Sequence, residues 1–227
     1  LTFADQITYI EEELCTTTVD ENGNFECSFE CEHTIYVFIH LGLYEAFLFV
    51  EPGKTYEIIL PEFKEKSLAD ELNPYFKPTN YHLGILNSSE NELNYQLAFF
   101  DEIYALMGSK SLYQIYDKIR EIDDDNMIND VDTVYSAEAY QKIVNNSTAY
   151  ISNNIKNIDV SAEIKKVDSL FSGVDNKFFN DFKRYKFALY QSVSADQKMK
   201  SISDTYYLNN EILYENPAYM ELFNKVY

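Results

Sequence analysis

The chain has 227 residues, of which 46% are hydrophobic and 16% aromatic, and this composition predicts a packed core and excludes a disordered chain. Its 38 acidic and 18 basic side chains give a formal charge of −20, which repels phosphate backbones and excludes nucleic acid as a partner. The longest apolar region, residues 35–50, is interrupted by His40 and Glu45 and is too short for the ~20 residues of a transmembrane segment.

Residues 1–66 predict an antiparallel, β-sandwich-like module. An Asn22-Gly23 turn precedes residues 25–31, where apolar and polar side chains alternate with the two-residue period of a strand. Two strands rich in β-branched and aromatic residues are predicted for Thr34–Leu41 and Leu43–Val50. These patterns predict a short meander with one dry face.

A turn and a connection follow this meander. Glu51-Pro52-Gly53-Lys54 has the proline and glycine positions of a type II turn, and it leads into a predicted strand at Thr55–Leu60. Residues 67–88 contain two prolines and no sustained period, so we expect a long surface connection there.

Residues 89–227 predict an irregular α-helical bundle, so the fold class is α+β. Ser89 and Glu92 have the spacing of a capping box, and the apolar residues between Leu93 and Tyr104 recur at helical spacing. Asn216 followed by Pro217 is typical of a helix start. The other predicted helices cover residues 111–122, 137–155, 161–171 and 176–193 and a short segment after Ser194.

Three cysteines, Cys15, Cys27 and Cys31, show no C-x-x-C spacing, so neither a zinc site nor a redox pair is predicted. Cys27 and Cys31 are too far apart along one strand to bridge each other. The hairpin leaves two alternatives open, a Cys15–Cys31 disulfide or buried, reduced thiols.

The sequence carries no recognisable catalytic motif. His33, His40 and His82 lack metal-binding or catalytic spacing, and we expect them to be exposed or partly buried. Phosphate-binding glycine loops and nucleophile motifs do not occur. We therefore assign no catalytic, cofactor-binding or metal-binding residue and expect no cofactor.

Two acidic segments have some calcium-loop character. Residues 20–24 lack the distal glutamate of a calcium loop and are explained by the hairpin turn. Residues 123–132 are explained by a solvated loop between helices, with metal binding as the alternative.

Twenty tyrosines could form a recognition surface, but packing on helical stripes explains most of them. The tyrosines on or beside such stripes are Tyr104, Tyr113, Tyr116, Tyr150, Tyr185 and Tyr190.

Several segments together are similar to one known arrangement. In the first part of the chain they are Asp5-Gln6-Ile7-Thr8, Val19-Asp20-x-Asn22-Gly23-x-Phe25, Phe49-Val50-Glu51-Pro52-Gly53-Lys54-x-Tyr56 and Leu60-Pro61. In the second part they are Asn73-Pro74-x-Phe76, Glu92-Leu93-Asn94, Phe100-Asp101-x-x-Tyr104 and the segment from Ile212 to Met220. The chain resembles the β-rich N-terminal domain and helical insert that precede the thioredoxin fold in exported Bacteroidetes proteins of the TlpA/ResA type.

The resemblance implies a periplasmic or outer-membrane-surface location and a thioredoxin-like partner domain with a C-x-x-C pair beyond Tyr227. This chain would then be a non-catalytic accessory region that presents substrates to a disulfide oxidoreductase. The alternative is a cell-surface or periplasmic binding module for a peptide or glycan, with a protein or peptide as partner. A hydrolase with a scattered acidic site is a third hypothesis, and it predicts a pocket with perturbed carboxylates.

Overall fold

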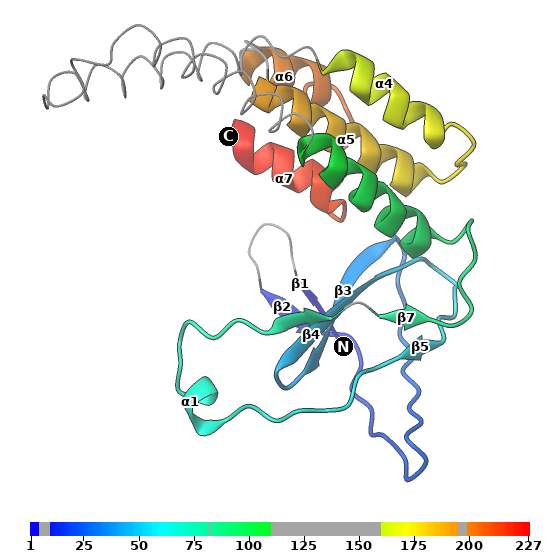
Figure 1. Cartoon of the computed structure of the whole chain (residues 1–227), viewed down its shortest axis with the longest axis vertical. Helices are drawn as coiled ribbons and strands as arrows, with labels where there is room; N and C mark the ends of the chain where they lie inside the picture. The colour runs from blue at the N-terminus through cyan, green and yellow to red at the C-terminus, as the bar shows by residue number, and fades with distance from the viewer. Residues whose placement is uncertain (5–9, 82, 110–159, 195–198) are drawn as a thin grey trace, which may run out of the picture.

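The computed structural model describes residues 1–4, 10–81, 83–109, 160–194 and 199–227. The predicted helices at 111–122 and 137–155, the acidic run 123–132, His82 and three of the tyrosines named above (Tyr113, Tyr116 and Tyr150) lie outside the described residues. The described part is a mixed five-stranded sheet, a smaller two-stranded sheet and a group of helices, which confirms the α+β class (Figure 1).

The larger sheet has the strand order β2-β1-β3-β4-β6. Its strands are β1 (Thr2–Ala4), β2 (Glu11–Glu13), β3 (Ile35–Leu41), β4 (Tyr44–Val50) and β6 (Thr79–Tyr81). β3 and β4 form an antiparallel hairpin from Ile35 opposite Val50 to Leu41 opposite Tyr44, as the sequence predicts. Gly42 closes it with a positive φ of 63°, which a side chain rarely adopts.

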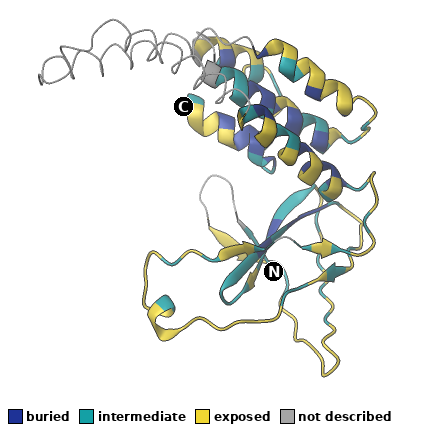
Figure 2. Ribbon diagram, viewed as in Figure 1, coloured by how far each residue is buried: buried dark blue, intermediate teal, exposed yellow. Residues whose placement is uncertain are grey.

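The sequence predicts a long surface connection for residues 67–88. The prediction is wrong at two places, because this segment contains the strands β6 and β7. β6 lies parallel to β4, so the larger sheet is mixed rather than purely antiparallel. β7 (Gly84–Ile85) pairs with β5 (Ile58–Ile59) in the smaller sheet. Strands this short carry no readable hydrophobic period, because alternation needs about four residues to be visible. Only the exposed α1 (Leu68–Glu71) and its neighbours fit the predicted surface connection (Figure 2).

Residues 25–31 are not a strand, although the sequence predicts one. Their burial still alternates, since Phe25, Cys27 and Phe29 are half-buried while Glu26 and Ser28 are exposed. Within the described part of the chain, no ladder joins residues 25–31 to a neighbouring strand. The Asn22-Gly23 turn does form, closed by Asp20 N–H donating to Asn24 O (2.8 Å).

The helices share one apolar core, and Phe49 of β4 and Tyr36 of β3 also pack in it. They are residues 93–109, α4 (Ser161–Leu170), α5 (Lys177–Ser194), α6 (Met199–Tyr206) and α7 (Pro217–Val226). Asn216 caps α7 as predicted, because its Oδ1 accepts from the N–H groups of Ala218 and Tyr219. The helix of residues 93–109 begins after Glu92. The Glu92 carboxylate accepts from Tyr95 N–H, so Glu92 caps this helix rather than Ser89.

Candidate functional site

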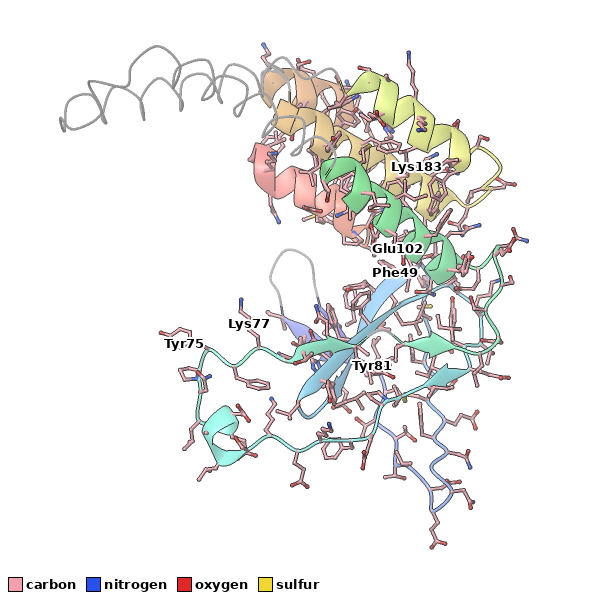
Figure 3. The ribbon with its side chains drawn as sticks, in the orientation of Figure 1. Phe49, Tyr75, Lys77, Tyr81, Glu102 and Lys183 are labelled. Carbon is pink, nitrogen blue, oxygen red and sulfur yellow. A yellow bond between two sulfur atoms is a disulfide. The ribbon has the colours of Figure 1, made fainter. Side chains whose placement is uncertain are left out.

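The sheet and the helices meet at Phe49, near the end of β4. Its ring is 7% exposed and lies 5.5 Å from the ring of Phe178 and 6.3 Å from that of Phe182, both on α5. Tyr36 on β3 covers the other side, with ring centroids 4.7 Å apart. Figure 3 shows Phe49 at the end of the sheet nearest the helices. One aromatic side chain therefore joins the two halves of the core.

Asn94 lies on the first turn of the helix at 93–109. Its side chain is hydrogen-bonded to the backbone of Phe49. Phe49 N–H donates to Asn94 Oδ1 (2.7 Å), and Asn94 Nδ2 donates to Phe49 O (2.9 Å). β6 pairs with β4 at Tyr44–Ala46, so among the described residues no strand lies beside Phe49 at this edge. The carboxamide of Asn94 takes the place of that missing strand.

A polar pocket of about 620 Å³ opens beside this contact. Three segments line it, contributing residues from Glu51 to Tyr56, from Asn87 to Gln96 and from Gly173 to Asn176. We call this pocket the junction cleft, because the first segment follows β4, the second leads into the helix at 93–109 and the third connects α4 to α5. Figure 1 shows the β5–β7 sheet and the α4–α5 loop on the same side of the molecule.

Hydrogen bonds hold the walls of the junction cleft in place. Asn176 Nδ2 donates to Glu51 Oε1 (3.0 Å), which links the α4–α5 loop to the sheet. Asn87 Oδ1 accepts from Glu57 N–H (3.0 Å), and its Nδ2 donates to Thr55 O (2.8 Å). These bonds span the segments, so the side chains of the cleft are positioned before any ligand arrives.

Tyr56 and the turn at 51–54 form one side of the cleft. The predicted type II turn is confirmed by Lys54 N–H donating to Glu51 O (3.2 Å) and by a φ of 70° at Gly53. Tyr56 Oη accepts from Glu51 N–H (3.0 Å). Burial raises the pKa of Tyr56 to about 12, so its hydroxyl keeps its proton and can donate.

Gln96 is the one buried side chain of the cleft wall with an unpaired atom. The residue is 8% exposed, and its Nε2 makes a long bond to Glu90 O (3.4 Å). Its Oε1 accepts no hydrogen bond from the described residues. A buried acceptor without a donor costs about 1–3 kcal/mol. Oε1 is covered in the described conformation, so a ligand donor reaches it only when the carboxamide turns toward the pocket.

His40 has more partners than the sequence indicates. It is exposed on β3, as expected, and its Nε2 lies 3.0 Å from Glu11 Oε2 and 3.0 Å from Thr2 Oγ1. Its Nδ1 lies 3.3 Å from Glu45 Oε1. Through these contacts His40 on β3 connects side chains of β1, β2 and β4 at the surface of the sheet. This structural role accounts for the histidine. His33 is exposed.

The acidic loop at residues 20–24 uses its carboxylate internally. Asp20 Oδ1 accepts from the N–H groups of Asn22 (2.9 Å) and Asn24 (2.7 Å), and Oδ2 accepts from Asn24 Nδ2 (3.1 Å). These hydrogen bonds from Asn24 and Asn22 hold the pKa of Asp20 below its usual value. Among the described residues no group of three or more histidines, cysteines or acids could hold a metal ion.

Cys15 and Cys27 form a disulfide, with their Cα atoms 6.0 Å apart, while Cys31 is a free, half-buried thiol. The alternative of a Cys15–Cys31 bridge is therefore wrong. That pairing assumed a regular hairpin, but no ladder joins residues 15–19 to residues 25–31, so strand register does not set which cysteines meet. Leu1 lies beside Cys15, because the nitrogen of Leu1 donates to Cys15 O (2.9 Å).

The predicted stripe tyrosines within the described residues, Tyr104, Tyr185 and Tyr190, follow the packing interpretation. Hydroxyl groups inside the core donate to backbone carbonyls of neighbouring helices, as Tyr104 does to Lys186 O (3.1 Å) and Tyr185 does to Tyr206 O (3.2 Å). Their rings lie in the aromatic core rather than on an open surface.

None of the described helices is both long enough and apolar enough to cross a membrane.

Comparison of the chain with protein-family models, curated proteins and solved structures found no significant match. The similarity to the N-terminal region of TlpA/ResA-type proteins therefore stays a prediction from the residues. The junction cleft and its amide side chains are not signalled by any sequence motif, because the three segments come together only in the fold.

Proposed function

We propose that this chain is an accessory region of an exported thioredoxin-like disulfide oxidoreductase, which presents a substrate to a redox domain and makes no bond itself. The observation that supports the proposal is the rigid contact between the sheet and the helices of this chain. Asn94 is hydrogen-bonded to the Phe49 backbone, and the Phe49 ring lies in the helical core. A region that sets the position of a partner domain needs this kind of rigid connection.

The Cys15–Cys27 disulfide supports the exported location. Structural disulfides persist in oxidising compartments such as the periplasm and the cell surface, and they are rare in the cytosol. The bridge closes a sequence separation of 12 residues around the turn at Asn22-Gly23. It therefore stabilises a loop that has no strand ladder of its own.

The location is tested by peptide mass spectrometry of the protein from its native cells, which counts labels at the three cysteines of this chain separately. Free thiols are alkylated before and after reduction, and the proposal expects a label at Cys31 before reduction and labels at Cys15 and Cys27 only after it. Labels at all three positions before reduction would contradict an oxidising compartment.

The accessory role is tested on the natural full-length product. We expect it to reduce a small disulfide and a protein disulfide, and we expect Phe49→Ala to lower only the rate with the protein substrate. A natural product that reduces no disulfide would end this proposal. Equal loss with both substrates would show damage to the redox domain rather than lost presentation.

A second candidate function, a binding module for a peptide or glycan, is favoured by the junction cleft. A pocket of about 620 Å³ lies within the usual range of small-molecule sites, and polar side chains converge on it. The two candidates are compatible, because a region that holds a ligand can also accompany a redox domain.

A further inference from the structure

We propose that the junction cleft binds a neutral saccharide. The inference narrows the second candidate function to one ligand class and one set of residues. It does not depend on a thioredoxin-like domain. The argument rests on the charge of the cleft, on its lack of apolar anchors, on its fixed amide groups and on the unpaired oxygen of Gln96.

The charge of the lining disfavours anions. Glu51, Glu92 and Asp175 face a single basic side chain, that of Lys54. The carboxylates of Glu51 and Glu92 already accept hydrogen bonds from asparagine side chains. A phosphate or an acidic sugar would meet net negative charge here, on a chain whose formal charge is −20.

The cleft offers little to an apolar side chain. Val174 and the ring of Tyr56 are its main apolar groups, and the remaining lining is the ammonium group of Lys54 together with amide, hydroxyl, carboxylate and glycine residues. Peptide recognition usually depends on an apolar or aromatic anchor in a matching pocket. A saccharide has no such need, because its hydroxyl groups both donate and accept.

The amides of the cleft suit a ligand with many hydroxyl groups. Asn87 and Asn176 are fixed by bonds to the backbone and to Glu51, while Asn91 is exposed at the start of the helix. Asn87 and Asn176 each use the oxygen and one Nδ2 hydrogen in hydrogen bonds within the protein, so each keeps a second Nδ2 hydrogen and a second oxygen lone pair for the hydroxyl groups of a sugar ring. Fixed groups also reduce the entropy lost on binding.

Gln96 distinguishes this cleft from an ordinary polar surface. Its Oε1 lacks a donor although the residue is 8% exposed, and its Nε2 is held only by the 3.4 Å bond to Glu90 O. So weak a bond lets the carboxamide turn toward the cleft, where a ligand hydroxyl donates to Oε1. Binding then removes a defect of the free protein, which makes the contact favourable.

The test is an NMR titration of the ¹⁵N-labelled chain with neutral mono- and oligosaccharides of glucose, galactose, mannose and N-acetylglucosamine. Sialic acid, galacturonic acid and a set of tetrapeptides are titrated in parallel. We expect a neutral sugar to shift the side-chain amide signals of Asn87, Asn91 and Gln96, with a dissociation constant in the millimolar range or below. No response to any neutral sugar, or an equal response to the acidic sugars or peptides, would overturn the proposal.

Two variants separate binding from folding. Gln96→Leu replaces the unpaired amide by an apolar side chain of similar size, so we expect unchanged or higher thermal stability and at least about tenfold weaker binding. The control is Asn80→Ala on β6, which does not line the cleft and should leave binding unchanged. Unchanged binding in Gln96→Leu would contradict the assignment of the site. A negative result here leaves the disulfide-reductase assay unaffected, so the two proposals fail separately.

Discussion

Replacing Asn94 by alanine tests whether one side chain holds the sheet on the helices. The substitution removes the donor and the acceptor that pair with the Phe49 backbone at 2.9 and 2.7 Å. Phe49 lies opposite Tyr36 on β3, but its N–H and C=O both point to Asn94, so β3 cannot replace the lost bonds. The variant leaves two backbone groups of a residue that is 7% exposed without partners.

The magnitude follows from those two groups. An unsatisfied buried donor or acceptor costs about 1–3 kcal/mol, and water that enters at the partly buried edge recovers some of this. We therefore expect a loss of about 2 kcal/mol in the free energy of unfolding. For a chain of this size that corresponds to a fall of about 4–8 °C in the melting temperature.

Urea unfolding followed by tyrosine fluorescence and far-UV circular dichroism measures the effect. Asn91→Ala is the matched control, because Asn91 lies three residues earlier, is exposed, and should cost less than about 0.5 kcal/mol. Equal stability of the two variants would refute the reasoning. If the fluorescence and dichroism transitions differ in the Asn94 variant alone, the sheet and the helices separate before they unfold.

Three further changes test the fold. Phe49→Ala should cost about 3–5 kcal/mol in chemical denaturation, since it empties a site shared by both halves of the core; a loss below that of a surface substitution would contradict the junction. Cys27→Ser should cost about 3 kcal/mol through the opened loop, whereas Cys31→Ser should match the parent protein in the same assay. Gly42→Ala should lower the melting temperature or prevent folding, because a Cβ there would clash with Lys64 O; normal folding would mean that the β3–β4 turn is different.

The elements that the sequence predicts well are long or have distinctive ends. β3 and β4 have seven residues each and are rich in β-branched and aromatic types, and α7 begins at an Asn216-Pro217 pair whose capping role is local. Helical spacing likewise places Leu93, Leu97 and Phe100 on one face, and all three are buried. Such signals are contained within a few consecutive residues, so no knowledge of distant partners is needed.

The features that the sequence does not predict depend on distant partners. β6 and β7 have three and two residues and exist because β4 and β5 lie beside them. The Cys15–Cys27 pairing is not set by the register of a strand ladder, so the hairpin pattern does not predict it. Asn94 binds a backbone 45 positions away, and in the sequence it is one asparagine among many. The junction cleft is missed for the same reason.

The position of the junction cleft links ligand binding to the contact between the two halves. One wall follows β4 at Glu51 and the other carries Gln96 on the helix, so a saccharide that touches both binds the docked arrangement better than a separated one. At a ligand concentration of about 100 times the dissociation constant, such binding adds about 2.7 kcal/mol to stability. We therefore expect a bound sugar to restore the stability that Asn94→Ala removes, measured as a rise in melting temperature that Gln96→Leu abolishes. A sugar that binds the cleft but leaves the melting temperature of the Asn94 variant unchanged would show that it contacts only one wall.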